Sequence, residues 1–255
     1  MGMRPAIVVV LVSVGLMTPV TGTFAQPRSA QGACNPNRPS DFPLNRWAGW
    51  NVDGRGQTIG GVYARIFNYV PYVDPVSQGD FVYTWTMLTV DHPLGADAPY
   101  VQVGWVQFAN GERHTMEQWK KVGEPPLSRF VDPPQASNTY SYYDVLYNYR
   151  KGNFTFMVGG RDLHDDLPAW FTPTRAEVYA ETLSLASQMP GGRDPGSRQD
   201  LLDSSYYMNG AWHSFMPGAT INVNDIRGRD DSQYFGHTSP LSGGDLSIWD
   251  TACTR

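Results

Sequence analysis

Short segments rich in aromatic and β-branched residues recur along this chain, and turn residues separate them. The strongest covers residues 81–90 (FVYTWTMLTV) and is followed by a Pro-Leu-Gly turn. Another covers residues 100–108 and precedes an Asn-Gly dipeptide, which favours a hairpin turn, so residues 113–119 are expected to be the return strand. This pattern predicts an all-β fold, an antiparallel β-sandwich of the jelly-roll or lectin-like kind with two stacked sheets.

The same pattern extends over the rest of the chain. Further strands are expected at residues 62–69, 140–149, 153–158, 203–208, 211–215 and 245–249. The proline-rich stretch 124–134 is expected to be an irregular loop, and the polar stretch 222–231 a turn.

Residues 174–186 are ambiguous between helix and strand. Thr174 and Glu177 have the spacing of a capping box, and good helix formers follow. A strand would instead alternate between two faces. Its core face would carry Ala176, Val178 and Ala180. Its other face would carry Arg175, Glu177, Tyr179 and Glu181. Periodicity alone leaves both structures open.

The beginning of the chain is typical of a secretory signal peptide. The charge of Arg4 precedes an apolar run over residues 6–17, and a small-residue stretch ends at Ala25. The run is shorter than the roughly 20 residues that a membrane-spanning helix needs. We therefore expect residues 1–25 to be a signal peptide, 26–40 an extended lead-in and 41–255 one β-sandwich domain. The mature protein would be secreted and extracellular, without membrane insertion.

The two cysteines fit an oxidising compartment. Cys34 closely follows the expected cleavage site and Cys253 is third from the end, so a disulfide would tie the ends of the mature chain together. Two free thiols, or two ligands of a shared metal, are the alternative, although neither cysteine has a zinc-like spacing. We expect the disulfide, with no metal and no cofactor.

Composition and motifs argue against several classes of function. Charged residues make up 17% of the chain and the formal net charge is −5, which argues against nucleic acid as a partner because its phosphates require a basic surface. The sequence contains no G-x-S-x-G nucleophile elbow, no H-E-x-x-H zinc helix and no P-loop. Its five histidines are scattered without the spacing of metal ligands.

Two segments carry a family resemblance when they are read together. The first is YVQVGW at residues 100–105. The second is AEV at residues 176–178, with SQMPG downstream at residues 187–191. Their order and spacing resemble the neprosin family of β-sandwich glutamic peptidases, in which a strand close to I-E-A-G-W-Q supplies one glutamate and a later G-G-E-V strand the other. The resemblance covers about residues 61–192 and favours a strand for the ambiguous segment.

The sequence departs from that family at the first glutamate. Gln102 stands there, and Ala176 replaces the glycine before Glu177. The stretch before the domain is also too short for the family's usual pro-region. The related scytalidoglutamic peptidases work with a glutamine and a glutamate, so the resemblance implies a secreted glutamic-type endopeptidase of that variant kind.

The resemblance implies Gln102 and Glu177 as the catalytic pair. Glu177 would take a proton from a water held between the two side chains, and Gln102 would donate its amide N–H to the oxyanion. Glu177 would then return the proton to the leaving amine, which favours acidic pH. Trp105, Tyr179 and Glu181 are expected as substrate-binding neighbours.

A second hypothesis is a secreted, non-catalytic binding module. The partner would be a polypeptide substrate in the first case, and an extracellular glycan or extended peptide in the second. A monomer is expected in both. A pair that faces across the sheet within reach of one water favours hydrolysis. A Glu177 carboxylate that is paired with Arg175 and turned away from Gln102 favours binding.

Overall fold

The computed structural model describes residues 44–76, 79–90, 97–131, 133–216, 219–238 and 243–252, apart from the side chain of Asp165. The expected signal peptide and lead-in lie outside these residues, as do Cys34 and Cys253. The cleavage site and the disulfide therefore stay predictions.

The regular structure of the described residues is almost entirely β-strand. In chain order these are β1 (Arg46–Asp53), β2 (Ile59–Phe67), β3 (Phe81–Thr89), β4 (Tyr100–Phe108), β5 (Arg113–Lys120), β6 (Leu127–Val131), β7 (Tyr140–Asn148), β8 (Asn153–Val158), β9 (Arg161–Pro168), β10 (Arg175–Thr182), β11 (Gln199–Met208), β12 (Ala211–Ser214), β13 (Thr220–Asp225), β14 (Phe235–His237) and β15 (Leu246–Asp250). A short 3-10 helix, η2 (Pro195–Ser197), lies between β10 and β11. None of the described segments forms a helix long and apolar enough to span a membrane.

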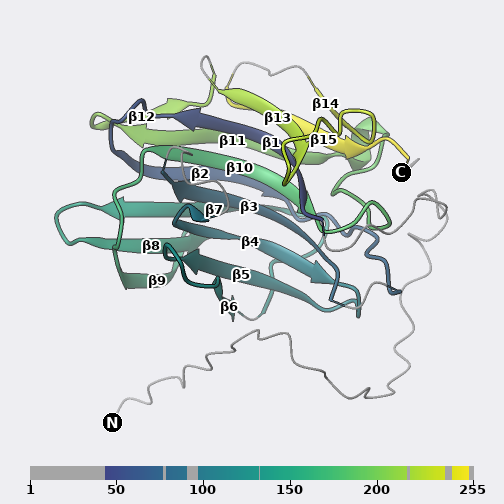
Figure 1. The fold of residues 1–255 in the computed structure, drawn as a ribbon, viewed down its shortest axis with the longest axis horizontal. Coiled ribbons are helices and arrows are strands. Elements are labelled where there is room, and N and C mark those ends of the chain that lie inside the picture. Colours follow the sequence, from purple (N-terminus) through teal and green to yellow (C-terminus); the bar gives the residue numbers. More distant parts are fainter. Residues whose placement is uncertain are drawn as a thin grey trace, which may run out of the picture.

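The strands form two antiparallel sheets. Sheet A has the order β13-β1-β10-β3-β4-β5-β6, and sheet B has the order β14-β15-β11-β2-β7-β8-β9, with β12 paired to β11. Figure 1 shows the strands of the two sheets running in roughly the same direction, as in an aligned sandwich. The predicted all-β sandwich is confirmed.

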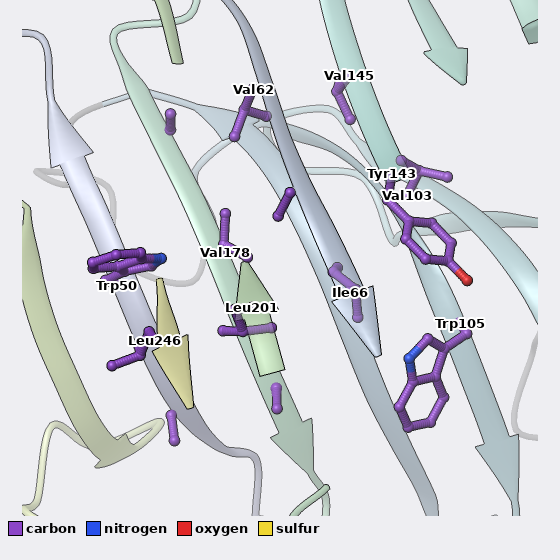
Figure 2. Close-up of a cluster of buried hydrophobic side chains, with 14 of the residues drawn as sticks. Trp50, Val62, Ile66, Val103, Trp105, Tyr143, Val145, Val178, Leu201 and Leu246 are labelled. Atoms are coloured by element: carbon purple, nitrogen blue, oxygen red, sulfur yellow. The ribbon is translucent and has the colours of Figure 1, made fainter. Parts of the chain in front are cut away.

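The hydrophobic core fills the space between the two sheets. Trp50 and Val178 of sheet A meet Val62, Leu201 and other side chains of sheet B there, as Figure 2 shows. Each of these four side chains is fully buried. Burial of a large apolar side chain contributes about 1.5–3 kcal/mol, so this layer is the main force that holds the sheets together.

The ambiguous segment forms strand β10, in the middle of sheet A. It pairs with β1 on one side and β3 on the other, and these pairings override its helix propensity, which is a weak preference. Its two faces are those expected of a strand. The core face carries Ala176, Val178 and Ala180. The outer face carries Arg175, Glu177, Tyr179 and Glu181.

Two expectations about irregular segments are wrong. Part of the proline-rich stretch forms β6, which pairs with β5 and extends sheet A. Part of the polar stretch forms β13, which pairs with β1. In both cases the segment is a strand because a neighbouring strand supplies its backbone hydrogen bonds. Neither segment has the alternating apolar pattern by which a strand is predicted from sequence. The sequence pattern also fails to predict β1, whose residues are buried on both faces.

Candidate active site

The face of sheet A that points away from the core carries a cleft of about 500 Å³. Strand register arranges its residues in rows that cross the strands. One row consists of Thr220, Asn51, Glu177, Met87, Gln102, Gln118 and Ser128. Glu177 of β10 and Gln102 of β4 therefore lie on the two strands that flank β3, with Met87 between them.

Gln102 and Glu177 lie in the same row, on the two strands that flank β3. Neighbouring strands lie about 4.8 Å apart, so the two Cα atoms are separated by about 10 Å. Both side chains line the cleft, and they are only 4% and 5% exposed. The sequence-predicted pair is thus brought into one cavity, on the same face of the sheet.

Arg175 balances the charge of Glu177. Its Nε donates to Glu177 Oε1 at 2.5 Å, and both side chains line the cleft. This ion pair is one half of the arrangement expected of a binding module. The Glu177 side chain lines the same cleft as Gln102, on the other side of β3.

The amide of Gln102 is held in place by Gln118. Gln102 Nε2 donates to Gln118 Oε1 at 2.7 Å, and the Tyr100 hydroxyl donates to the same oxygen at 2.7 Å. Gln118 is anchored in turn, since its Nε2 donates to Ser128 Oγ at 2.9 Å. An amide nitrogen carries two hydrogens, and the one not given to Gln118 lies near the hydroxyl oxygen of Tyr83, which a substrate oxyanion would replace as acceptor.

Tyr179 lies in the next row of the cleft. Its hydroxyl oxygen accepts hydrogen bonds from Asn51 Nδ2 at 2.8 Å and from Asn222 Nδ2 at 2.7 Å. Burial, with the nearby charge of Glu177, raises the pKa of Tyr179 well above its usual range. The hydroxyl therefore stays protonated and can donate its hydrogen to a carbonyl oxygen in the cleft.

Glu181 is a second buried acid in the cleft. Its Oε1 accepts from Asn45 Nδ2 at 2.6 Å and its Oε2 from Trp85 Nε1 at 3.0 Å. Burial raises the pKa of Glu181 to about 6, although these two hydrogen bonds act in the opposite direction. Four residues along a strand span about 13 Å, so Glu181 lies well away from Glu177 and is not part of the same pair.

Two glycines allow sheet A to pack closely beside Tyr179. A Cβ atom at Gly104 would stand 1.9 Å from the carbonyl oxygen of Thr84, and one at Gly49 would stand 2.2 Å from that of Val178. No side chain fits at either position. Gly104, the glycine of the first motif segment, is therefore required by the close approach of β3 and β4.

The expected position of Trp105 beside the pair is wrong. Its side chain is fully buried between the two sheets, as Figure 2 shows, with the guanidinium of Arg113 at 4.7 Å from its ring. Trp105 is three residues from Gln102, and alternation along a strand puts such residues on opposite faces. It packs in the core and does not line the cleft.

Several cleft residues have no sequence signal that identifies them. Among these are Asn45, Trp47, Trp85 and Asn222. Asn45, Trp47 and Asn222 come from segments that the sequence pattern does not predict as strands. Trp85 lies in a predicted strand that is buried on both faces, with its larger apolar side chains on the face of the cleft, so the pattern does not identify the cleft face. Across the described residues, no group of three or more His, Cys, Asp and Glu side chains could hold a metal ion.

Comparisons with known proteins find similarity at the level of structure. No protein-family model matches the sequence, and no curated protein matches it. A scytalidoglutamic peptidase bound to a peptide-based transition-state analogue matches with a TM-score of 0.55 and 14% identity, over 84% of this chain and 100% of that chain. SCP-B, a member of the eqolisin family of peptidases bound to the tripeptide Ala-Ile-His, matches with the same TM-score, identity and coverage. This chain has the fold of the glutamic peptidases.

Proposed function

We propose that this protein is an exported glutamic-type endopeptidase, related to the neprosin family, that hydrolyses peptide bonds with Glu177 and Gln102. The observation that supports the proposal most strongly is that Glu177 and Gln102 lie in the same row of side chains across sheet A. This acid and this amide are both almost fully buried, flank one strand and line one cleft. The protein that contains them has the fold of the glutamic peptidases.

The reaction needs one water between the two side chains. The Glu177 carboxylate takes a proton from this water, whose oxygen attacks the carbon of the scissile carbonyl. The carbonyl oxygen becomes an oxyanion and accepts a hydrogen bond from the Gln102 amide. Glu177 then gives the proton to the leaving nitrogen, the C–N bond breaks, and the carboxylate is regenerated.

The surrounding groups support this division of roles. Arg175 holds one oxygen of Glu177, and Gln118 holds the amide of Gln102, so both reacting groups are oriented before substrate binds. Glu181 has a pKa of about 6, so it is neutral in acidic solution. Acidic pH therefore reduces the negative charge of the cleft and favours protonation of the leaving nitrogen.

The second candidate is a binding module that holds a glycan or an extended peptide without cutting it. Two observations favour it. Arg175 engages the Glu177 carboxylate, and aromatic side chains line much of the cleft, as in a surface that stacks on ligands. The two candidates share the cleft and differ in whether Glu177 performs chemistry.

The test is digestion of a denatured protein substrate across about pH 3–7 by the wild-type protein, Glu177→Gln and Glu181→Gln. We expect Glu177→Gln to reduce cleavage to the background rate, because the amide cannot accept the proton of the water. Glu181→Gln is the matched control. It makes the same substitution on the same face of β10, and we expect it to keep at least about a tenth of the wild-type rate.

Two outcomes would contradict the peptidase. One is equal loss in both variants, which would mean that any change in the charge of the cleft disrupts it. The other is absence of cleavage by folded wild-type protein at every pH. Retained binding of a glycan or peptide in that second case would support the binding module.

A further inference from the structure

The outer face of sheet B lies on the opposite side of the sandwich from the cleft and is unusually aromatic. Alternation along β2 and β7 points Val62 and Tyr143 into the core and their neighbours outward. The outward aromatic residues are Tyr63, Phe67, Tyr140, Tyr142, Tyr207 and Trp212. Tyr140, Tyr142 and Trp212 are 44%, 42% and 44% exposed. An outward sheet face is ordinarily polar, and a surface of clustered exposed rings indicates a binding role.

These rings are held by one another. The ring of Trp212 lies 4.8 Å from that of Tyr63 and 5.4 Å from that of Tyr207, both edge to face. Tyr63 makes a similar contact with Tyr142 at 6.0 Å. Gly61 leaves room for Trp212, because a Cβ atom there would meet its ring at 3.0 Å. The surface is therefore ordered before any ligand binds.

One arginine of the chain already shows what this surface accommodates. Arg65 of β2 places its guanidinium carbon 5.2 Å from the centre of the Tyr140 ring. Its Nε lies 3.0 Å from Asp203 Oδ2. A guanidinium thus rests between an aromatic ring and a carboxylate, the combination that arginine fills best.

Further along β7, aromatic rings and a carboxylate again share this face, but there no cation accompanies them. Asp144 follows Tyr142 by two residues on the same face, and it lies directly opposite Tyr63 of β2 and Met157 of β8. Within the described part of the chain no cation lies against Asp144, since Arg65 pairs with Asp203. Burial alone raises the pKa of Asp144 to about 7. The fold therefore keeps a carboxylate whose charge is poorly hydrated and uncompensated, at a cost in stability.

We propose that this face binds an arginine-bearing segment of another polypeptide, whose guanidinium pairs with Asp144 and stacks on Tyr63 and Tyr142. The charge of the face is complementary to such a partner. Its carboxylates are those of Asp144, Asp162, Asp200, Asp203 and Asp245, and its cations are those of Arg65 and Arg198, so carboxylates outnumber cations. A neutral glycan stacks on rings but leaves the Asp144 carboxylate without a counter-charge, so a cationic side chain fits better.

The test measures binding of an acetylated, amidated peptide of alternating glycine and arginine, by calorimetry at pH 8. The protein carries Glu177→Gln so that the peptide is not cut. We expect Asp144→Asn to weaken binding by about tenfold or more, and a peptide with citrulline in place of arginine not to bind. Asp200→Asn is the matched control. It removes a charge from the same face, but Asp200 is already engaged by Tyr140 and Ser247, so we expect less than about a threefold change.

Binding should also depend on pH in a specific direction. Only the ionised carboxylate attracts the guanidinium, which stays charged throughout, so affinity should rise between pH 5 and pH 8 in the wild-type face and not in Asp144→Asn. The outward titratable and charged groups on the strands packed against Asp144 are Tyr63 and Arg65 of β2, Tyr142 of β7 and Asp162 of β9, and β8 contributes Met157. Asp144→Asn should also raise the melting temperature at pH 8 in the absence of peptide, which shows that the variant is folded.

Four results would overturn the proposal. They are absence of arginine-peptide binding, equal binding of the citrulline peptide, equal affinity in Asp144→Asn, and equal affinity for free argininamide. The last would mean a site for small cations in place of polypeptides. None of these results bears on hydrolysis in the cleft, because the two faces lie on opposite sides of the sandwich.

Discussion

Gln102→Ala is expected to lower kcat for peptide hydrolysis by about 10²–10³-fold, with little change in KM. The oxyanion forms only as the water attacks, so a donor to it stabilises the transition state more than the bound substrate. The folded structure should persist, because the substitution removes only the hydrogen bond from Nε2 to Gln118 and the interaction with the Tyr83 hydroxyl. Initial rates at saturating and subsaturating concentrations of a fluorogenic peptide separate kcat from KM.

Gln118→Ala is the matched control for this prediction. It removes an amide from the same row, one strand further from Glu177, and takes away the acceptor that orients Gln102. We expect a loss in kcat of about tenfold or less, because the donor itself remains. Equal losses in the two variants would contradict a specific role of the Gln102 N–H and would indicate that the row acts as a unit.

Arg129→Met is expected to destabilise the fold by about 3–5 kcal/mol at pH 7. Glu117 of β5 points between the sheets and is fully buried, and Arg129 Nη2 lies 2.8 Å from its Oε1. The same nitrogen donates to the carbonyl oxygen of Leu163 in sheet B, so the pair also joins the edges of the two sheets. Loss of the guanidinium leaves a buried carboxylate with only His164 nearby, whose Nδ1 is 3.6 Å from Glu117 Oε2.

The double variant Glu117→Leu/Arg129→Met distinguishes a lost counter-charge from lost packing. With both charges replaced by apolar side chains, most of the lost stability should return, since no ion remains buried. The measurement is urea unfolding followed by tryptophan fluorescence, with the midpoint and slope fitted for each variant. A loss below about 1 kcal/mol in the single variant would mean that water reaches Glu117 and replaces its partner.

The alternation of side chains along strands is what allows part of the fold and of the site to be predicted from the sequence. Once residues 175–182 are taken as a strand, period-two alternation puts Glu177, Tyr179 and Glu181 on one face, as observed. The same rule applied to residues 100–108 would have separated Trp105 from Gln102. Trp105 therefore belongs to the core face of β4, although it lies in the same motif segment as Gln102.

The rest of the cleft depends on strand order, which the sequence does not encode locally. Sheet A brings β13, β1 and β10 side by side, so Asn51 pairs with Thr220 and with Glu177 although more than 100 residues separate each pair along the chain. Such pairings depend on the packing of the whole core and on backbone hydrogen bonds. Residues of low strand propensity make these hydrogen bonds equally well, so local sequence does not indicate the pairing. The Asn51 and Asn222 bonds to Tyr179 could not be predicted without that order.

The catalytic pairing of Glu177 with Gln102 is tested most directly by a crystal structure of this protein with a peptide that carries a hydroxyl-bearing, non-cleavable mimic of the tetrahedral intermediate. We expect the mimic's hydroxyl oxygen to lie between Glu177 and Gln102, within about 2.6–3.2 Å of a Glu177 carboxylate oxygen and of Gln102 Nε2. An inhibitor that binds elsewhere in the cleft, with Glu177 still paired only to protein groups, would contradict the claim that this pair hydrolyses peptide bonds.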